Sequence, residues 1–265
     1  MYQYLGNTGI ALYGFFGTVG QIIAFIWNLC HIKAKCQMLS RISVSVCNWA
    51  VDKKRFSFLS NQTLWAIFET VLFSVFQLMF IGTMNFWFGP MVGTGANYFG
   101  TLFFVPIILT LICFLIGMDP RKQMDLLTPT FPFLLIFVKL ACFCQGCCRG
   151  IEWECGMHNY AVQANEFPVQ LMEMSIAAAI FVFFLVVGKN IKKGCVFPVY
   201  IILYSATRFF SEFLRCEKNV LLFLKTYQIL CIIGVVYGVV LLKLLDVFDE
   251  KLNNIFEKRQ TDDLQ

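Results

Sequence analysis

The sequence has 265 residues, of which 58% are apolar and only 14% charged, and its mean hydropathy is +0.70. Soluble domains contain about 45–50% apolar and about 25% charged residues, so this composition excludes a water-soluble globular protein. The net charge of +5 does not indicate nucleic-acid binding, because the basic residues lie in short stretches between apolar runs, where they orient helices in a membrane.

The apolar runs predict an all-α integral membrane protein with about seven transmembrane helices, since a helix of about 20 residues crosses a bilayer. The expected spans are 9–30, 63–86, 99–118, 127–147, 169–188, 196–214 and 226–246. Residues 1–7 contain no Lys or Arg and no cleavage site follows the first run, so we expect a retained helix there. We expect one membrane domain, 1–248, and a short polar cytoplasmic tail, 249–265.

The distribution of Lys and Arg predicts the orientation, because loops with many basic residues alternate along the chain with loops that have few. The rich segments are the first, third and fifth loops and the tail, with Lys33, Lys35, Arg41, Lys53, Lys54, Arg55, Arg121, Lys122, Lys189, Lys192, Lys193, Lys243, Lys251, Lys258 and Arg259. The other loops carry only Arg149, Arg215, Lys218 and Lys225. The positive-inside rule then predicts the N-terminus outside and the C-terminus inside, which requires an odd number of spans.

The sixth predicted span carries the most ionisable side chains. Tyr204, Arg208 and Glu212 are four residues apart and share one helix face, and Arg215 lies one turn further towards the outside. Charges in hydrocarbon are costly unless they are paired or line a wet cavity. Two interpretations stay open: an ion pair that locks helices together, and a basic pocket in which the planar fork of Arg binds phosphate.

Two other spans contain buried polar candidates. Gln170 and Glu173 lie one turn apart just after Pro168, which is typical of a helix N-terminus as well as of a catalytic pair. Lys139 falls near the middle of the fourth span, where a partner or an anionic ligand is a better explanation than snorkelling.

A cysteine cluster follows the fourth span, with Cys142, Cys144, Cys147, Cys148 and Cys155, and His158 comes three residues later. The Cys-x-x-Cys and Cys-x-x-His spacings resemble those of zinc ligands, but the pattern is imperfect. A disulfide on the outer face and thiols that only pack are further alternatives. The sequence alone therefore assigns no metal ligands.

Several segments, in chain order, resemble the prolipoprotein diacylglyceryl transferase family. The segment 138–150 resembles the family's helix-end motif in its Cys-rich variant, which ends Gly-Cys-Cys-x-Gly as Gly146 to Gly150 do. Pro168, Gln170 and Glu173 match Pro-x-Gln-Leu-Tyr-Glu. The most specific match is to Tyr-x-x-x-Arg-Phe-x-x-Glu-Phe-x-Arg, formed by Tyr204, Arg208, Phe209, Glu212, Phe213 and Arg215. Tyr227-Gln228 and Leu12-Tyr13-Gly14 resemble two further motifs.

The resemblance implies seven helices in the bacterial plasma membrane and transfer of a diacylglyceryl group from phosphatidylglycerol to a thiol. The acceptor is the lipobox cysteine of a prolipoprotein signal peptide, the product a thioether, and no cofactor is needed. Membrane lipids are the expected surroundings and nucleic acid is not an expected partner.

The resemblance also implies roles for individual residues. The expected catalytic residues are Arg208, Glu212, Lys139 and Glu173; the expected substrate-binding residues are Tyr13, Tyr204, Gln170, Gly146, Gly150 and Arg215. Arg208 would stabilise the phosphate with help from Lys139, and Glu212 would hold Arg208. Glu173 is one candidate for the base that takes the thiol proton.

The chain also departs from the family pattern. Lys139 replaces the helix-end arginine, and the loop before the third span has no His, since the chain contains only His31 and His158. Two alternatives therefore stay open beside the active transferase. One is a catalytically altered or inactive relative that binds lipid. The other is a thiol-redox or metal-binding membrane protein that uses the 142–155 cluster.

Overall fold

The computed structural model describes residues 15–16, 18–20, 22–23, 26, 98–116, 119–159, 162–216 and 224–262, and only the backbone of 112, 115–116 and 248–262. The predicted span 63–86, Tyr13 and the second half of the first span lie outside these residues, apart from Ile22, Ile23 and Ile26. The chain forms two compact units, Met1–Ala24 with Arg121–Leu252 and Phe25–Pro120 with Asn253–Gln265. In the second unit, helix α4 (Tyr98–Ile116) coincides with the predicted span 99–118.

The described part of the first unit is mostly helical, as predicted. Its helices are α5 (Pro120–Leu127), α6 (Thr130–Gln145), α7 (Val169–Val187), α8 (Val196–Ser211) and α9 (Thr226–Asp262), with short 3-10 helices at Gly188–Asn190 and Glu212–Leu214. Three helical segments among the described residues are long and apolar enough to cross a membrane: Pro120–Gln145, Val169–Asn190 and Thr226–Val247.

Two expectations need correction. Arg121 and Lys122 were expected in a loop but belong to α5, which leads directly into α6, so this apolar segment starts earlier than 127. The fold is also not all-α, because the segment between α6 and α7 forms an antiparallel hairpin of β1 (Glu152–Asn159) and β2 (Ala164–Glu166). In β1 the apolar Trp153, Cys155 and Met157 alternate with Glu152, Glu154, Gly156 and His158, a period-two pattern that the prediction of a loop did not use.

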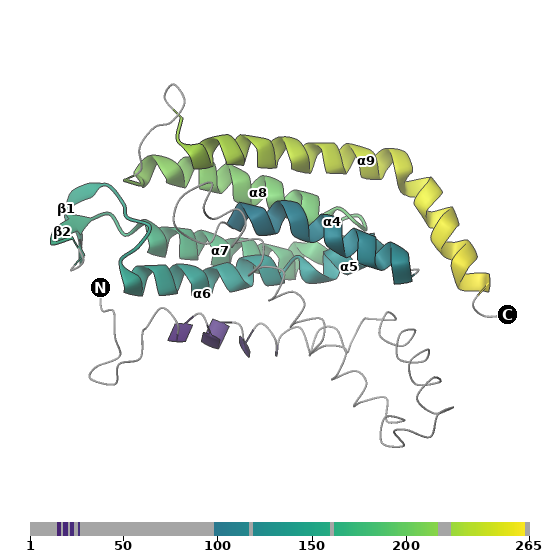
Figure 1. Cartoon of the computed structure of the whole chain (residues 1–265), viewed down its shortest axis with the longest axis horizontal. Helices are drawn as coiled ribbons and strands as arrows, with labels where there is room; N and C mark the ends of the chain where they lie inside the picture. Colours follow the sequence, from purple (N-terminus) through teal and green to yellow (C-terminus); the bar gives the residue numbers. More distant parts are fainter. Residues whose placement is uncertain are drawn as a thin grey trace, which may run out of the picture. The chain divides into compact units, whose positions relative to one another are not determined.

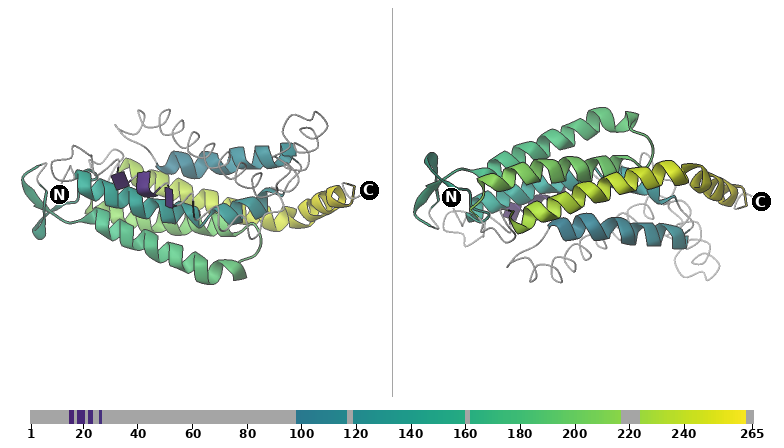
Figure 2. Two further views of the ribbon diagram at one scale, coloured as in Figure 1. Left: turned by 90° about the horizontal axis from the view of Figure 1, so that it is seen from below. Right: turned by 90° about the horizontal axis from the view of Figure 1, so that it is seen from above.

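Helices α6, α7, α8 and α9 run side by side, with the hairpin at one end of the group (Figures 1 and 2). Small residues allow the close approach of two of them: a methyl group added at Gly238 of α9 would lie 2.6 Å from Ile202 Cγ1 of α8. The core between α6, α7 and α8 is aromatic. Tyr200 is fully buried there and packs against Phe131 and Phe184.

The ends of these helices have specific caps. Helix α6 ends at Gly146, whose φ of +73° lies in the left-handed region that favours glycine, and its N–H donates to the carbonyl oxygen of Cys142. The Asp125 carboxylate of α5 accepts hydrogen bonds from the backbone N–H groups of Gly194 and Val196, so an anion caps the N-terminus of α8. These caps fix the end of α6 and the start of α8, and therefore the positions of the side chains near those helix ends.

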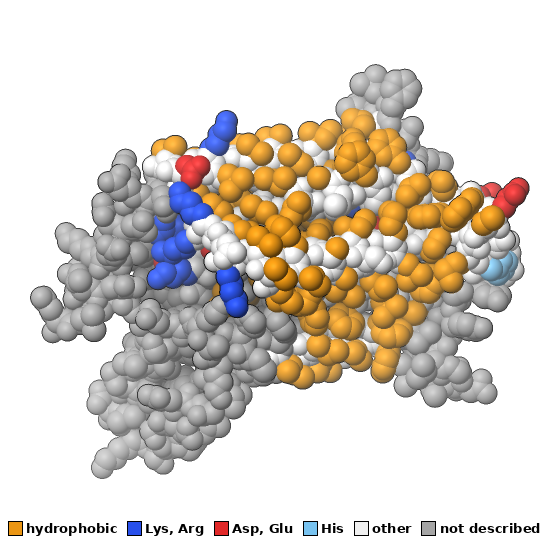
Figure 3. Space-filling view, turned by 180° about the vertical axis from the view of Figure 1, so that it is seen from behind, with side chains coloured by type: hydrophobic (Ala, Val, Ile, Leu, Met, Phe, Trp, Pro, Cys, Tyr) orange, Lys and Arg blue, Asp and Glu red, His pale blue; other side chains and the backbone are white. Residues whose placement is uncertain are grey.

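The surface of the described residues is typical of a membrane protein. Figure 3 shows a broad apolar face with Lys and Arg side chains at one end, and His at the other end. Arg121 and Lys122 of α5 precede α6, and Lys189 follows α7, whereas the hairpin joins the other ends of α6 and α7, so these basic residues lie opposite the hairpin. This distribution agrees with the predicted orientation, in which the hairpin side faces outwards, although the seven spans and the orientation stay predictions.

Candidate functional site

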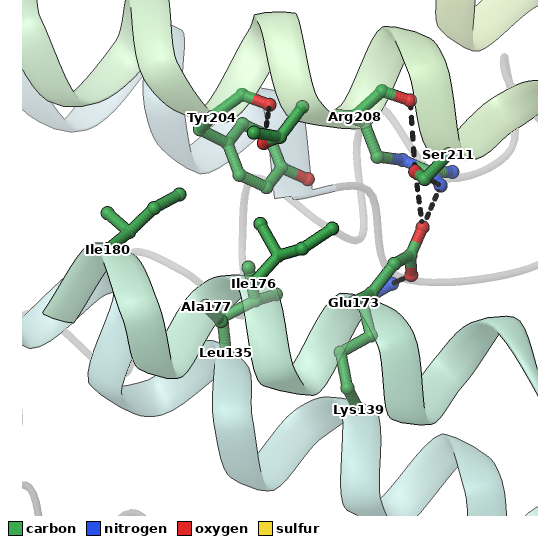
Figure 4. A pocket seen from close by; sticks show the side chains of 10 residues that line it. Leu135, Lys139, Glu173, Ile176, Ala177, Ile180, Tyr204, Arg208 and Ser211 are labelled. Carbon is green, nitrogen blue, oxygen red and sulfur yellow. Dashed lines mark hydrogen bonds and ion pairs between the residues drawn. The ribbon is translucent and has the colours of Figure 1, made fainter.

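A single carboxylate, Glu173 of α7, connects three buried cations from two other segments. Its Oε2 lies 2.6 Å from Lys139 Nζ of α6 and 2.8 Å from Arg215 Nη2. Its Oε1 pairs with Arg208 of α8 and accepts a hydrogen bond of 2.9 Å from Ser211 Oγ. Figure 4 shows Glu173 pointing from α7 towards Arg208 and Ser211, with Lys139 approaching from α6. All three cations are at least nine-tenths buried.

A second carboxylate belongs to the same cluster. Glu212 is fully buried, and its Oε2 lies 2.7 Å from Arg208 Nη2 and 3.9 Å from Arg215 Nε. The predicted ion pair between Arg208 and Glu212 is therefore present, but Arg208 also reaches across to α7. Three cations share two carboxylates, so the cluster carries excess positive charge even before Lys225 is considered.

Helix α9 closes the cluster from another side. Lys225 Nζ donates to the backbone carbonyl oxygens of Glu212 and Arg215, each at 2.6 Å. The backbone N–H of Lys225 donates to Gln228 Oε1 at 2.9 Å, which caps the start of α9 in the manner of a capping box. The guanidinium of Arg208 lies 5.3 Å from the ring centroid of Tyr227, within cation–π distance.

A pocket opens beside the charged cluster. Lys139, Glu173, Arg208 and Ser211 form its polar end, with Tyr204 and Thr207 beside them. The rest of the lining is aliphatic and comes from Leu135, Ile176, Ala177 and Ile180 (Figure 4). The site therefore combines a cationic end with an apolar wall.

Gln170 lies at the first turn of α7, as its position after Pro168 predicts. Its side-chain Nε2 donates to the carbonyl oxygen of Cys147 at 2.6 Å. Its Oε1 has no hydrogen-bond partner among the described residues, although the side chain is 1% exposed. A buried acceptor without a partner costs about 1–3 kcal/mol, which a ligand hydroxyl can offset.

The hairpin is fastened to the helix end that precedes it. Glu166 of β2 accepts a hydrogen bond of 2.6 Å from Arg149 Nε and one of 3.0 Å from Asn159 Nδ2. Asn159 Nδ2 also donates to the carbonyl oxygen of Gly146 at 3.3 Å. Gly150 forms a β-bridge with Arg215, which ties the loop after α6 to the end of α8. Gly146 and Gly150, predicted to bind substrate, thus shape the loop beside the cluster.

Three cysteines converge at the end of α6. The sulfur atoms of Cys142, Cys147 and Cys148 all lie within 4.8 Å of one another, and all three residues are thiols in the structure. The pKa of the Cys148 thiol lies well below its ordinary value, because it receives hydrogen bonds from Cys142 and then Cys147, and because Lys139 and Arg215 lie nearby. Cys155 is exposed on β1, apart from this group.

The structure brings most of the predicted site residues together. Lys139, Glu173, Arg208, Glu212 and Arg215 form the ion-pair cluster, Tyr204 lines the pocket, and Gln170 reaches the adjoining loop. Sequence reasoning did not single out Ser211 or Lys225. Ser211 lies three residues after Arg208 and so on the same face, which was the signal that could have found it.

Comparison with known proteins gives one family. The model of the family described as prolipoprotein diacylglyceryl transferase matches residues 1–244. A phosphatidylglycerol–prolipoprotein diacylglyceryl transferase of Clostridium tetani is 27% identical over 157 residues, which cover 56% of this chain and 63% of that protein. A protein of Clostridium perfringens, named as the second transferase of this kind, is 30% identical over 127 residues, 44% of this chain and 49% of the relative.

The matched segments thus cover between about half and under two thirds of these curated relatives. The family match extends over nearly the whole chain and agrees with the apolar helices of the described residues. The chain belongs to the prolipoprotein diacylglyceryl transferase family.

Proposed function

We propose that the protein transfers a diacylglyceryl group from phosphatidylglycerol to the lipobox cysteine thiol in the signal peptide of bacterial prolipoproteins. The thiol sulfur attacks the glycerol carbon that bears the phosphate, a thioether forms, and glycerol phosphate leaves. The observation that carries this proposal is the buried cluster of Lys139, Arg208 and Arg215 around Glu173, which opens into an apolar pocket.

The charge of the cluster suits this reaction. Negative charge develops on the phosphate oxygen as the carbon–oxygen bond breaks, and fixed cations in a water-poor site stabilise that charge. The carboxylates of Glu173 and Glu212 hold the two terminal nitrogens of Arg208 in place, and the second N–H of Nη2 can donate to a phosphate oxygen. The cluster's excess positive charge matches the single negative charge of a phosphodiester.

The shape of the pocket suits a lipid. A phospholipid has an anionic headgroup next to two hydrocarbon chains, and the pocket has a cationic end next to an aliphatic wall. The wall consists of Leu135, Ile176, Ala177 and Ile180.

The residues near the headgroup take distinct roles in this proposal. Gln170 Oε1 accepts a hydrogen bond from a glycerol hydroxyl, and Tyr204 donates to a phosphate or glycerol oxygen. Glu173 acts as the anion that positions Lys139, Arg208 and Arg215, because a carboxylate paired with three cations is a poor proton acceptor. Tyr13 lies outside the described residues, so its role in substrate binding stays a prediction. The binding of the acceptor peptide also stays a prediction.

The wider setting of the proposal is a multi-pass protein of the bacterial plasma membrane. About seven helices would cross the bilayer, with the N-terminus outside and the C-terminus inside. The cluster lies near the hairpin end of the helices, the end that this orientation turns outwards.

The test uses a bacterial strain whose own diacylglyceryl transferase can be switched off. Lipidation of a model prolipoprotein is followed by its gel shift with the parent chain, with Arg208→Ala and with Lys192→Ala. Lys192 is a matched control, since its ion pair with Asp246 is exposed. We expect lipidation by the parent and by Lys192→Ala, and a loss of about 10²–10³-fold in rate with Arg208→Ala. No lipidation by a folded, membrane-inserted parent chain would refute the proposal.

A further inference from the structure

Cys142, Cys147 and Cys148 form a cluster of three thiols, here called the thiol trio, that has no part in the phosphate chemistry just described. The three sulfur atoms lie within 4.8 Å of one another at the end of α6, the junction with the hairpin in Figure 1. Cys142 is buried, and Cys147 and Cys148 are half-buried. Cys144 of the same motif is not part of the group.

The backbone bends to bring these thiols together. Gly146 ends the helix in the left-handed region, and the N–H of Cys147 then donates to the carbonyl oxygen of Cys142 at 3.2 Å. Cys148 also has a positive φ of 57°, which is costly for a residue other than glycine. Such a conformation persists where the surrounding structure holds it, and it is a reason to look for a function. Because Cys147 and Cys148 lie in a bent loop, these neighbours can face one centre.

We propose that Cys142, Cys147 and Cys148 form a binding site for a thiophilic metal ion, best matched by Zn²⁺, which binds and activates the substrate thiol. The activating role rests on the proposed transferase function; the metal site itself does not. Zn²⁺ binds cysteine sulfur at about 2.3 Å, so three sulfurs around one ion are roughly 3.8 Å apart. The thiols need only small side-chain movements to reach that arrangement.

The surroundings suit such an ion. Three protein ligands with a fourth position open is the pattern of catalytic rather than structural zinc sites. Three thiolates around Zn²⁺ carry one net negative charge. Lys139, one turn before Cys142 on α6, and Arg215, whose backbone bridges to Gly150, provide nearby positive charge. Cys142 follows Lys139 by three residues on the same face of α6, and Lys139 pairs with Glu173. The metal site and the cation cluster are therefore neighbours.

The ion would supply what the cation cluster lacks, which is a way to remove the proton from the acceptor thiol. A thiol that coordinates Zn²⁺ loses its proton, here to solvent water. The bound thiolate sulfur then donates an electron pair to the glycerol carbon, the sulfur–carbon bond forms, and the carbon–oxygen bond breaks. The phosphate oxygen keeps the electron pair of that bond and leaves as glycerol phosphate, held by Arg208. The step is a nucleophilic substitution with no net oxidation or reduction, so no oxidant or reductant is required.

The metal site is tested first by binding, independently of activity. The purified, reduced full chain is freed of metal and titrated with Zn²⁺, with metal content measured by mass spectrometry. Cd²⁺ is titrated in parallel, because its thiolate complexes absorb in the ultraviolet. We expect one ion per chain, and a loss of more than about 100-fold in affinity in Cys142→Ser, Cys147→Ser and Cys148→Ser. The matched control is Cys155→Ser, which removes an exposed thiol and should bind as the parent does.

A second measurement needs no variant and so avoids misfolded protein. Zn²⁺ should protect the three thiols of the folded parent chain from maleimide, while Cys155 reacts equally with and without the ion. Absence of stoichiometric binding, a disulfide within the trio in place of the ion, or equal labelling of the trio with and without Zn²⁺ would overturn the metal site.

Activity then separates the two proposals. A chelated parent chain should lose lipid transfer and recover it with Zn²⁺, and Arg208→Ala should lose transfer but keep the ion. Full transfer by the chelated protein would overturn thiol activation. Metal binding as described, without transfer under any condition, would support the site and overturn both the transferase proposal and thiol activation.

Discussion

Replacing Glu173 by glutamine removes the carboxylate that three buried cations share. Lys139 and Arg215 lose partners at 2.6 and 2.8 Å, and among the described residues Arg208 keeps Glu212 as its one carboxylate partner. Because Glu173 is 6% exposed, water cannot easily replace it. Removal of one partner from a buried ion pair costs about 3–5 kcal/mol, mainly because the remaining charge stays buried. We therefore expect Glu173→Gln to lower the free energy of unfolding by at least about 3 kcal/mol.

The free energy of unfolding is measured by titration with sodium dodecyl sulfate in mixed micelles, followed by circular dichroism. The control is Asp246→Asn, which breaks an ion pair whose side chains are 52% and 69% exposed and should cost no more than about 1 kcal/mol. The double variant Glu173→Gln/Lys139→Met removes one of the stranded cations and should be less unstable than the two single changes predict. A Glu173→Gln variant as stable as Asp246→Asn would refute the view that Glu173 holds the cluster.

Three further predictions concern other parts of the molecule. Gln170→Leu removes the donor to Cys147 and the buried acceptor Oε1, so it should raise KM for phosphatidylglycerol about tenfold or more. An unchanged KM would contradict the proposal that Gln170 binds the lipid headgroup. Gly238→Val places atoms where Ile202 and Pro198 already lie, so it should lower the unfolding free energy by about 1–3 kcal/mol, and equal stability would refute the close packing of α8 on α9. In intact cells Cys155 should react with a membrane-impermeant maleimide, while Lys192→Cys should react only after permeabilisation, and the reverse pattern would overturn the predicted orientation.

The helices of the first unit were predictable from their hydropathy. Apolar runs and helix signals such as Pro168 before α7 placed α6, α7 and α8 and the start of α9 within a few residues of their observed bounds. The end of α9 was not predicted, because the helix continues to Asp262, well beyond the apolar run that ends near 246. The start of α5 was missed because Arg121 and Lys122 resemble a cytoplasmic loop, yet both fit a helix that carries Asp125 to the N-terminus of α8. Hydropathy detects long apolar segments, and it does not detect a polar helix that lies at the end of such a segment.

The hairpin escaped prediction for a different reason. The apolar alternation of Trp153, Cys155 and Met157 in β1 is short and β2 has only three residues, so the strand signal is weak. The attachment of the hairpin depends on polar contacts of Glu166 with Arg149 and Asn159. Polar contacts of this kind have no local periodicity, so a sequence without aligned relatives gives no sign of them. The hairpin was therefore expected to be a loop.

The sequence allowed us to predict the residues of the ion-pair cluster, but not that Glu173 lies at its centre. The four-residue spacing placed Arg208 and Glu212 on one face, and the predicted i,i+4 pair is present. The same pattern cannot reveal that α7 lies opposite, so Glu173 was interpreted as a helix-start acid or a base. Its three cationic contacts come from α6 and from the end of α8 and therefore depend on tertiary packing. A carboxylate in that position keeps three cations close together without a ligand, and the excess positive charge remains for an anionic headgroup. The acceptor thiol must then lose its proton by another route. In our proposal it does so on a metal ion held by Cys142, Cys147 and Cys148, and water takes the proton.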